Sequence, residues 1–235
     1  MKAILNSIIK TVKGSYSDAL GRNSLPKVEA PSFEGKAEAV ILGNSLTLHA
    51  PAPHLGWNEF HGMAASEKKA DYSHQLLHIL GINSEAAYIR NMYPLEVDSS
   101  PILEFKKQLE DLFANSANVD VVVLQLGDNV RNRKGATKEL SISMNEIFNS
   151  IPKEIHSSVF CVSTYWGKSI VDNVIRDICK KYNAYFVYIG DIYPRQNLAN
   201  DKYEYRGVNI HPKDKEMLMI AERIYGRIMS KKAGF

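Results

Sequence analysis

Residues 119–126 read VDVVVLQL, and this stretch decides the fold. It is apolar almost throughout and lacks the strict alternation of a strand that has one face in water. Such a run predicts a strand that is buried on both faces, at the centre of a parallel sheet.

On either side of this stretch, apolar runs alternate with amphipathic segments. The runs predict four more strands, at residues 37–42, 85–89, 158–163 and 184–189. The amphipathic segments predict helices at residues 66–80, 100–114, 137–149, 169–181 and 214–230. Five strands that alternate with helices through right-handed crossovers predict an α/β fold. We expect a three-layer α/β/α sandwich, with a five-stranded parallel sheet in the flavodoxin-like order.

Three helices carry more specific signals. Ser66 is expected to cap the helix at 66–80, and Gly81 to end it. Pro101 fits the first position of the next helix. The helix at 169–181 is expected to present one apolar face, formed by Ile170, Val174, Ile175 and Ile178.

Composition excludes several classes of protein. The 235 residues are 45% hydrophobic and carry a net charge of +3, with the basic residues scattered along the chain. This argues against disorder and against a nucleic-acid partner. No apolar run reaches the roughly 18 residues that a transmembrane segment needs. Cys161 and Cys179 lie in apolar stretches without metal-ligand spacing, so we expect two buried thiols.

The first 36 residues differ from the remainder. Residues 1–14 place an apolar stripe between lysines, which predicts a surface helix packed on the domain. A membrane-surface or partner-binding helix is the alternative. Residues 15–36 are polar, with glycines and prolines, and predict a linker. We therefore expect an N-terminal helix and linker at 1–36 and one domain at 37–235. Without a recognisable export signal, the expected location is cytoplasmic.

Ser45, Asn129 and His211 lie in loops that follow the first, third and fifth predicted strands. Ligands of such folds bind beyond the carboxyl ends of the strands. A serine hydroxyl needs a base in contact to act as a nucleophile, and histidine is the usual base. The amide of asparagine can donate to an oxyanion. Singly, each residue is more often a cap or a structural group, but together they predict acyl chemistry.

The residues around these three resemble the SGNH hydrolases, also called the GDSL lipase/esterase family. Residues 40–46, VILGNSL, are similar to the family's strand followed by Gly-Asp-Ser-Leu, with Asn44 in place of Asp. Residues 126–129, LGDN, and 209–212, NIHP, resemble the blocks that carry the oxyanion asparagine and the catalytic histidine.

The resemblance implies an SGNH fold over most of the chain and a role for each residue. Ser45 is the expected nucleophile and His211 the base. Asn129 and the backbone N–H of Ser45 are the expected oxyanion donors. The resemblance implies no cofactor and no metal.

The sequence departs from the family pattern at two places. The family usually has an Asp three residues before the His, and here that position is Val208. A backbone carbonyl can orient His211 instead, or one of the side chains Asp191, Asn209, Glu204 and Asp214. The family's second block normally carries a Gly that completes the oxyanion hole. Residues 90–93, RNMY, stand there without a Gly, although a backbone N–H of this segment can still donate.

Substrate contacts are expected from the loops at the same edge of the sheet. The candidates are Arg90, Asn91, Trp57 and Trp166. Arg90 can pair with an anionic substrate group or with a carboxylate of the fold. The tryptophans can stack on a sugar ring or close the core. His49, His54 and His61, with Glu59, are more readily explained as loop or surface residues than as a metal site.

The sequence thus predicts a serine esterase, an SGNH-type carboxylic ester hydrolase. Its expected substrate is a small-molecule or glycan ester, for example an O-acetylated carbohydrate. An acyltransferase on the same scaffold is one alternative. A non-catalytic glycan-binding or interaction protein on a decayed hydrolase scaffold is another. Nothing in the sequence indicates the oligomeric state.

Overall fold

The computed structural model describes residues 36–116, 118–193 and 202–234. Five strands form one parallel sheet in the order β2-β1-β3-β4-β5. Their bounds are β1 Ala39–Gly43, β2 Ala87–Asn91, β3 Val121–Gln125, β4 Val159–Val162 and β5 Tyr185–Val187. The sheet, its order and the interior place of the 119–126 segment confirm the predicted fold class.

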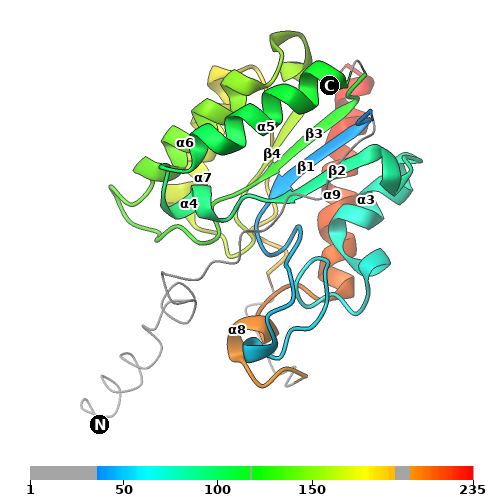
Figure 1. Ribbon diagram of the computed structural model, residues 1–235, viewed down its shortest axis with the longest axis vertical. Coiled ribbons are helices and arrows are strands. Elements are labelled where there is room, and N and C mark those ends of the chain that lie inside the picture. Colours follow the sequence, from blue (N-terminus) through cyan, green and yellow to red (C-terminus); the bar gives the residue numbers. More distant parts are fainter. Residues whose placement is uncertain (1–35, 117, 194–201, 235) are drawn as a thin grey trace. The chain divides into compact units, whose positions relative to one another are not determined.

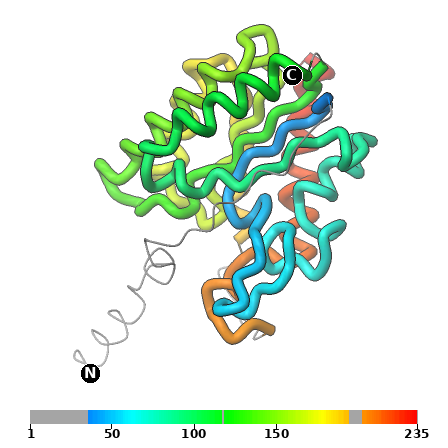
Figure 2. The backbone as a smooth tube through the Cα atoms, in the orientation of Figure 1, coloured from blue at the N-terminus to red at the C-terminus, as the bar shows by residue number. Residues whose placement is uncertain are grey.

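Helices cover both faces of this sheet (Figure 1). Their bounds are α3 Tyr72–Leu80, α4 Pro94–Val97, α5 Ile102–Asn115, α6 Lys138–Ser150, α7 Ser169–Lys181, α8 Arg206–Asn209 and α9 Asp214–Lys232. Figure 1 shows α5, α6 and α7 on one side of the sheet and α3 with α9 on the other. The smooth trace in Figure 2 shows the same three layers.

The side chains of the central strands divide between the two cores. In β3, Val122 and Leu124 pack in the core under α5, α6 and α7. Val121 and Val123 pack in the core under α3 and α9. A strand whose two faces are both covered needs apolar residues at every position, and this explains the unbroken apolar run.

Three details of the predicted helices are wrong. Pro101, expected at the first position of its helix, is the N-cap, and α5 begins at Ile102. The helix expected at 66–80 begins at Tyr72, and Asp71 caps it by accepting a hydrogen bond from the His74 N–H at 2.8 Å. Ser66 instead donates its N–H and its hydroxyl to the carboxylate of Asp214, at 2.7 and 2.6 Å. Ile170 is 39% exposed, and Val171 takes its place on the buried face of α7.

Other expectations have simpler outcomes. Cys161 and Cys179 are buried free thiols, as predicted. The predicted N-terminal helix and nearly all of the linker lie outside the described residues, so the domain boundary at residue 36 stays a prediction. In the part of the chain that the structure describes, no helix has the length and apolar character to cross a membrane.

Candidate active site

Ser45 and His211 meet beyond the carboxyl ends of the strands. Ser45 follows β1, and His211 lies between α8 and α9. The Oγ atom of Ser45 is 2.8 Å from Nε2 of His211. Both residues are buried, with exposed fractions of 5% and 6%. The sequence therefore brings together a hydroxyl and an imidazole from positions 166 residues apart.

A backbone carbonyl orients His211. Its Nδ1 lies 2.7 Å from the carbonyl oxygen of Gly207. Because a carbonyl only accepts, Nδ1 carries the proton and Nε2 is left to accept from the Ser45 hydroxyl. A carbonyl was one of the predicted substitutes for the Asp that Val208 replaces. Three of the other candidates have different partners, since Asp191 binds Arg223, Asn209 binds Tyr203 and Asp214 binds Ser66.

Burial keeps the imidazole of His211 neutral. Loss of hydration lowers the pKa of His211 to about 3, although the bond to the Gly207 carbonyl acts in the opposite direction. A neutral imidazole is the form that can take a proton from serine.

The turn that carries Ser45 depends on Gly43. A Cβ atom at this position would lie 1.8 Å from Oγ1 of Thr47, so no other residue fits. Asn44 then closes the turn, because its Oδ1 accepts the N–H of Leu46 at 3.1 Å. The Ser45 carbonyl accepts the N–H of Met63 at 2.8 Å, which ties the turn to the following loop.

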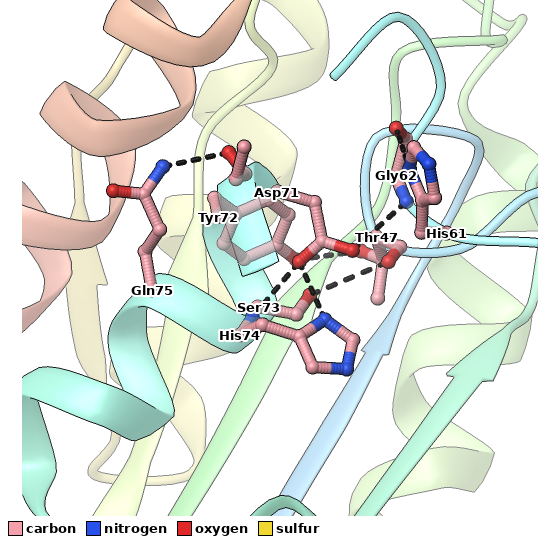
Figure 3. Close-up of polar contacts among 9 residues, drawn as sticks. Thr47, His61, Gly62, Asp71, Tyr72, Ser73, His74 and Gln75 are labelled. Carbon is pink, nitrogen blue, oxygen red and sulfur yellow. Dashed lines mark hydrogen bonds and ion pairs between the residues drawn. The ribbon is translucent and has the colours of Figure 1, made fainter. Parts of the chain in front are cut away.

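Asp71 holds that loop from the other side (Figure 3). Its buried carboxylate accepts the N–H of Gly62 at 3.0 Å and the backbone N–H of His74 at 2.8 Å. Nδ1 of His74 is also 2.8 Å from this carboxylate. The next residue, Tyr72, places its hydroxyl 2.5 Å from Oγ1 of Thr47. The start of α3 is thereby joined to the turn that carries Ser45.

Asn129 is joined to the loop after β1 through Glu96, a residue that sequence reasoning missed. The backbone N–H and the side-chain Nδ2 of Asn129 both donate to Oε2 of Glu96, at 3.2 and 2.5 Å. Oε1 of Glu96 accepts Nδ2 of Asn44, the neighbour of Ser45, at 2.9 Å. The role of Asn129 as an oxyanion donor stays a prediction.

Asp128 is a second buried carboxylate at this edge of the sheet. It accepts hydrogen bonds from Nε2 of Gln125 at 2.6 Å and from the backbone N–H of Tyr165 at 2.8 Å. Burial and the negative charge of Glu96 raise its pKa to about 7. Burial also raises the pKa of Glu96, against the effect of its hydrogen bonds. The sequence gives no sign that these two acids are buried, because most of the N–H groups that donate to them lie in other loops.

Comparison with known proteins adds the fold family. No protein-family model matches the sequence, and no curated protein matches it. Among solved structures, a protein from Bacteroides uniformis described as a GDSL-like lipase superposes with a TM-score of 0.53. The match covers 84% of this chain and 98% of that one, at 12% sequence identity. The chain has an SGNH hydrolase-like fold.

A second solved structure matches this chain over half of its own length. It is a two-domain esterase active on acetylated mannans, co-crystallised with mannopentaose. The match covers 84% of this chain and 50% of that one, with a TM-score of 0.48 and 15% identity.

Of the expected substrate contacts, only Trp166 lies against the Ser45–His211 pair. Its ring meets the His211 ring edge-on, with 5.4 Å between centroids. Trp57 is fully buried and packs against His61 and Tyr203, so it closes the core instead of lining a site.

The second-block residues of the SGNH pattern face internal partners. Arg90 is buried, binds the Tyr88 hydroxyl at 3.0 Å and also bonds to Gln108. Its guanidinium lies 4.4 Å from the centre of the Phe105 ring. The pairing is thus within the fold, as one prediction had it, but with neutral partners instead of a carboxylate. Asn91 donates to the Leu48 carbonyl at 2.7 Å and stabilises the loop after β1.

The histidines of this loop also have backbone partners. Nδ1 of His49 lies 2.6 Å from the Ala50 carbonyl, and Nδ1 of His61 lies 3.1 Å from the Gly62 carbonyl. Within residues 36–116, 118–193 and 202–234, no three potential ligand side chains are grouped as a metal site requires.

Proposed function

We propose that this protein is a serine esterase that hydrolyses a small acyl ester, with Ser45 as nucleophile and His211 as general base. The observation that carries the proposal is the 2.8 Å contact between Ser45 Oγ and His211 Nε2, together with the Nδ1 bond that selects the correct tautomer. An activated nucleophile is recognised by this arrangement, a base in contact with the hydroxyl and itself oriented by a third group.

The reaction proceeds in two steps. The Ser45 oxygen attacks the acyl carbon while His211 Nε2 takes the hydroxyl proton. The resulting oxyanion accepts hydrogen bonds from Asn129 and from backbone N–H groups. The intermediate collapses to an acyl-enzyme, and His211 returns the proton to the leaving alcohol. Water then attacks the acyl-enzyme with the same proton transfers and regenerates Ser45.

The burial of the pair favours a small acyl group. Only 5% of Ser45 is exposed, so a compact acyl group reaches its hydroxyl more readily than a bulky one. An acetyl group meets this limit, and the half-buried Trp166 beside His211 is the aromatic side chain that a sugar ring bound at this site would meet. We therefore propose an O-acetylated carbohydrate as the substrate.

A fluorophosphonate probe tests the proposal directly, because it reacts only with an activated serine. Wild-type protein is expected to be labelled at Ser45, and Ser45→Ala to be neither labelled nor able to hydrolyse p-nitrophenyl acetate. Ser141→Ala, which removes a serine from the distant helix α6, is the matched control and should behave as wild type.

Three outcomes separate the alternatives. Labelling at another residue, or full activity in Ser45→Ala, would refute the proposal. A labelled enzyme that transfers the acetyl group to an added sugar faster than to water would be an acyltransferase. Absence of both labelling and turnover would favour a binding protein.

A further inference from the structure

Glu96 lies where three loops of the site meet. It belongs to the four-residue helix α4, after β2, and its side chain is 1% exposed. Its carboxylate binds groups from the loop after β1 and from the loop after β3. A carboxylate this deeply buried is costly unless its oxygens are fully hydrogen-bonded.

Four neutral N–H groups of the described residues meet this requirement. Oε1 accepts from Nδ2 of Asn44 at 2.9 Å and from the backbone N–H of Gly127 at 2.6 Å. Oε2 accepts from the backbone N–H and from Nδ2 of Asn129. The four donors favour the ionised carboxyl group, because the hydrogen of a protonated oxygen would face donors. They thereby act against burial, which raises the pKa of Glu96.

The two bonds to Asn129 fix how its amide faces. A carboxylate cannot donate, so the NH₂ end of the Asn129 amide must point towards Glu96. One N–H of that end is then occupied, and the other keeps a defined direction. An oxyanion donor is effective only when its direction is set before the reaction.

We propose that Glu96 is the positioning residue of the oxyanion donor. It holds the side-chain amide of Asn129 in a fixed position relative to the turn that carries Ser45. This inference rests on the proposed esterase function. Glu96 touches neither Ser45 nor His211 in the hydrogen bonds described, so it acts through Asn129 and Asn44.

A double-mutant cycle between Glu96 and Asn129 tests this role. Gln at position 96 keeps one acceptor oxygen but turns an NH₂ group towards two of the four donors. We expect Glu96→Gln to lower kcat for p-nitrophenyl acetate by about 10- to 100-fold with little change in KM. This is less than the roughly 10²–10³-fold loss expected for Asn129→Ala, which removes the donor itself. In the Asn129→Ala background, Glu96→Gln should lower kcat by less than about twofold, since its effect has already been removed.

Glu139→Gln is the matched control. Glu139 also accepts two hydrogen bonds from a loop, from the N–H and hydroxyl of Ser99, but it has no bond to Asn129. It should leave kcat unchanged. If Glu96→Gln does not fold, Glu96→Asp takes its place in the same cycle. This variant keeps both carboxylate oxygens, but its side chain is one methylene shorter, so the oxygens lie farther from Asn129.

The outcomes separate this inference from the proposed function. A wild type that the fluorophosphonate does not label would overturn both. Normal labelling of Ser45, with losses in kcat that multiply independently in the cycle, would overturn only the role of Glu96. An unchanged kcat in folded Glu96→Gln would do the same.

Discussion

Asn44 stands between two buried carboxylates. Its Nδ2 donates to Glu96 at 2.9 Å and approaches Asp128 at 3.4 Å, while its Oδ1 accepts the N–H of Leu46. The SGNH pattern has an Asp at this position. An Asp here would place a third carboxylate against the other two, so the neutral amide is required by its neighbours.

Asn44→Asp is therefore expected to destabilise the fold by more than about 3 kcal/mol at pH 8, because it buries an unpaired charge. The clustered carboxyl groups have raised pKa values, so they take up protons as the pH falls, and the deficit should be smaller at pH 5. Glu96→Gln in the same protein should recover at least about 1 kcal/mol, since its NH₂ can donate to Asp at position 44. Urea denaturation at both pH values measures this. A deficit relative to wild type that is the same at pH 5 and pH 8 would contradict the expectation.

His211 should remain neutral well below the ordinary pKa of imidazole. Burial lowers its pKa to about 3, so its ring signals in NMR spectra should not titrate between pH 8 and pH 5, unlike those of free histidine. The unfolded chain binds this proton near pH 6.5 and the folded chain does not. This residue's contribution to the free energy of unfolding therefore falls as the pH drops from about 6.5 towards 3. A His211 titration centred near 6.5 would show that the ring is open to water.

At the scale of elements, the start of α3 supports the turn that carries Ser45. Asp71 caps α3 and also binds the N–H of Gly62, next to the Met63 N–H that donates to the Ser45 carbonyl (Figure 3). Asp71 therefore does more than cap the start of a helix, because it also holds the loop between β1 and α3.

Asp71→Ala should lower the free energy of unfolding by about 2–4 kcal/mol, since it removes a cap and leaves a buried N–H unpaired. Its fluorophosphonate labelling should also slow. Asn83→Ala is the control, because Asn83 caps an exposed turn through the Glu85 N–H and holds no loop. It should cost less than about 1 kcal/mol. Chemical denaturation measures both, and equal losses would contradict the role given to Asp71.

The same elements show what the sequence predicts and what it does not. The helix Ser169–Lys181 has its predicted bounds, because its signals are local. The start of α3 was misplaced because Ser66 is satisfied by Asp214, a partner 148 residues away. Ser45 and His211 lie together as expected, since both residue types are visible at strand and helix ends. The Gly207 carbonyl that orients His211 has no side-chain signal at all.

At the scale of the whole molecule, the two thiols report on global unfolding. Cys161 in β4 and Cys179 in α7 are 0% and 1% exposed, within the core on one side of the sheet. Reaching them requires α7 to separate from the sheet, which we expect only when the whole domain unfolds.

We expect no reaction of the native protein with Ellman's reagent, and reaction of both thiols across the same urea range in which circular dichroism is lost. Lys69→Cys, at a side chain that is 82% exposed, is the control and should react at once in native buffer. Thiol reaction at urea concentrations below the circular dichroism transition would mean that α7 opens separately.

The pairing of Asn44 with Glu96 also restricts the order in which this site can have evolved. If an Asp stood at position 44, as in the SGNH pattern, gaining an acid at position 96 would crowd three carboxylates around one turn. Exchanging the Asp for Asn first passes through a neutral and tolerable intermediate. Related chains with Asn at the first position and no acid at the second should therefore be common. Chains with acids at both position 44 and position 96 should be rare, and an alignment of related sequences can count them.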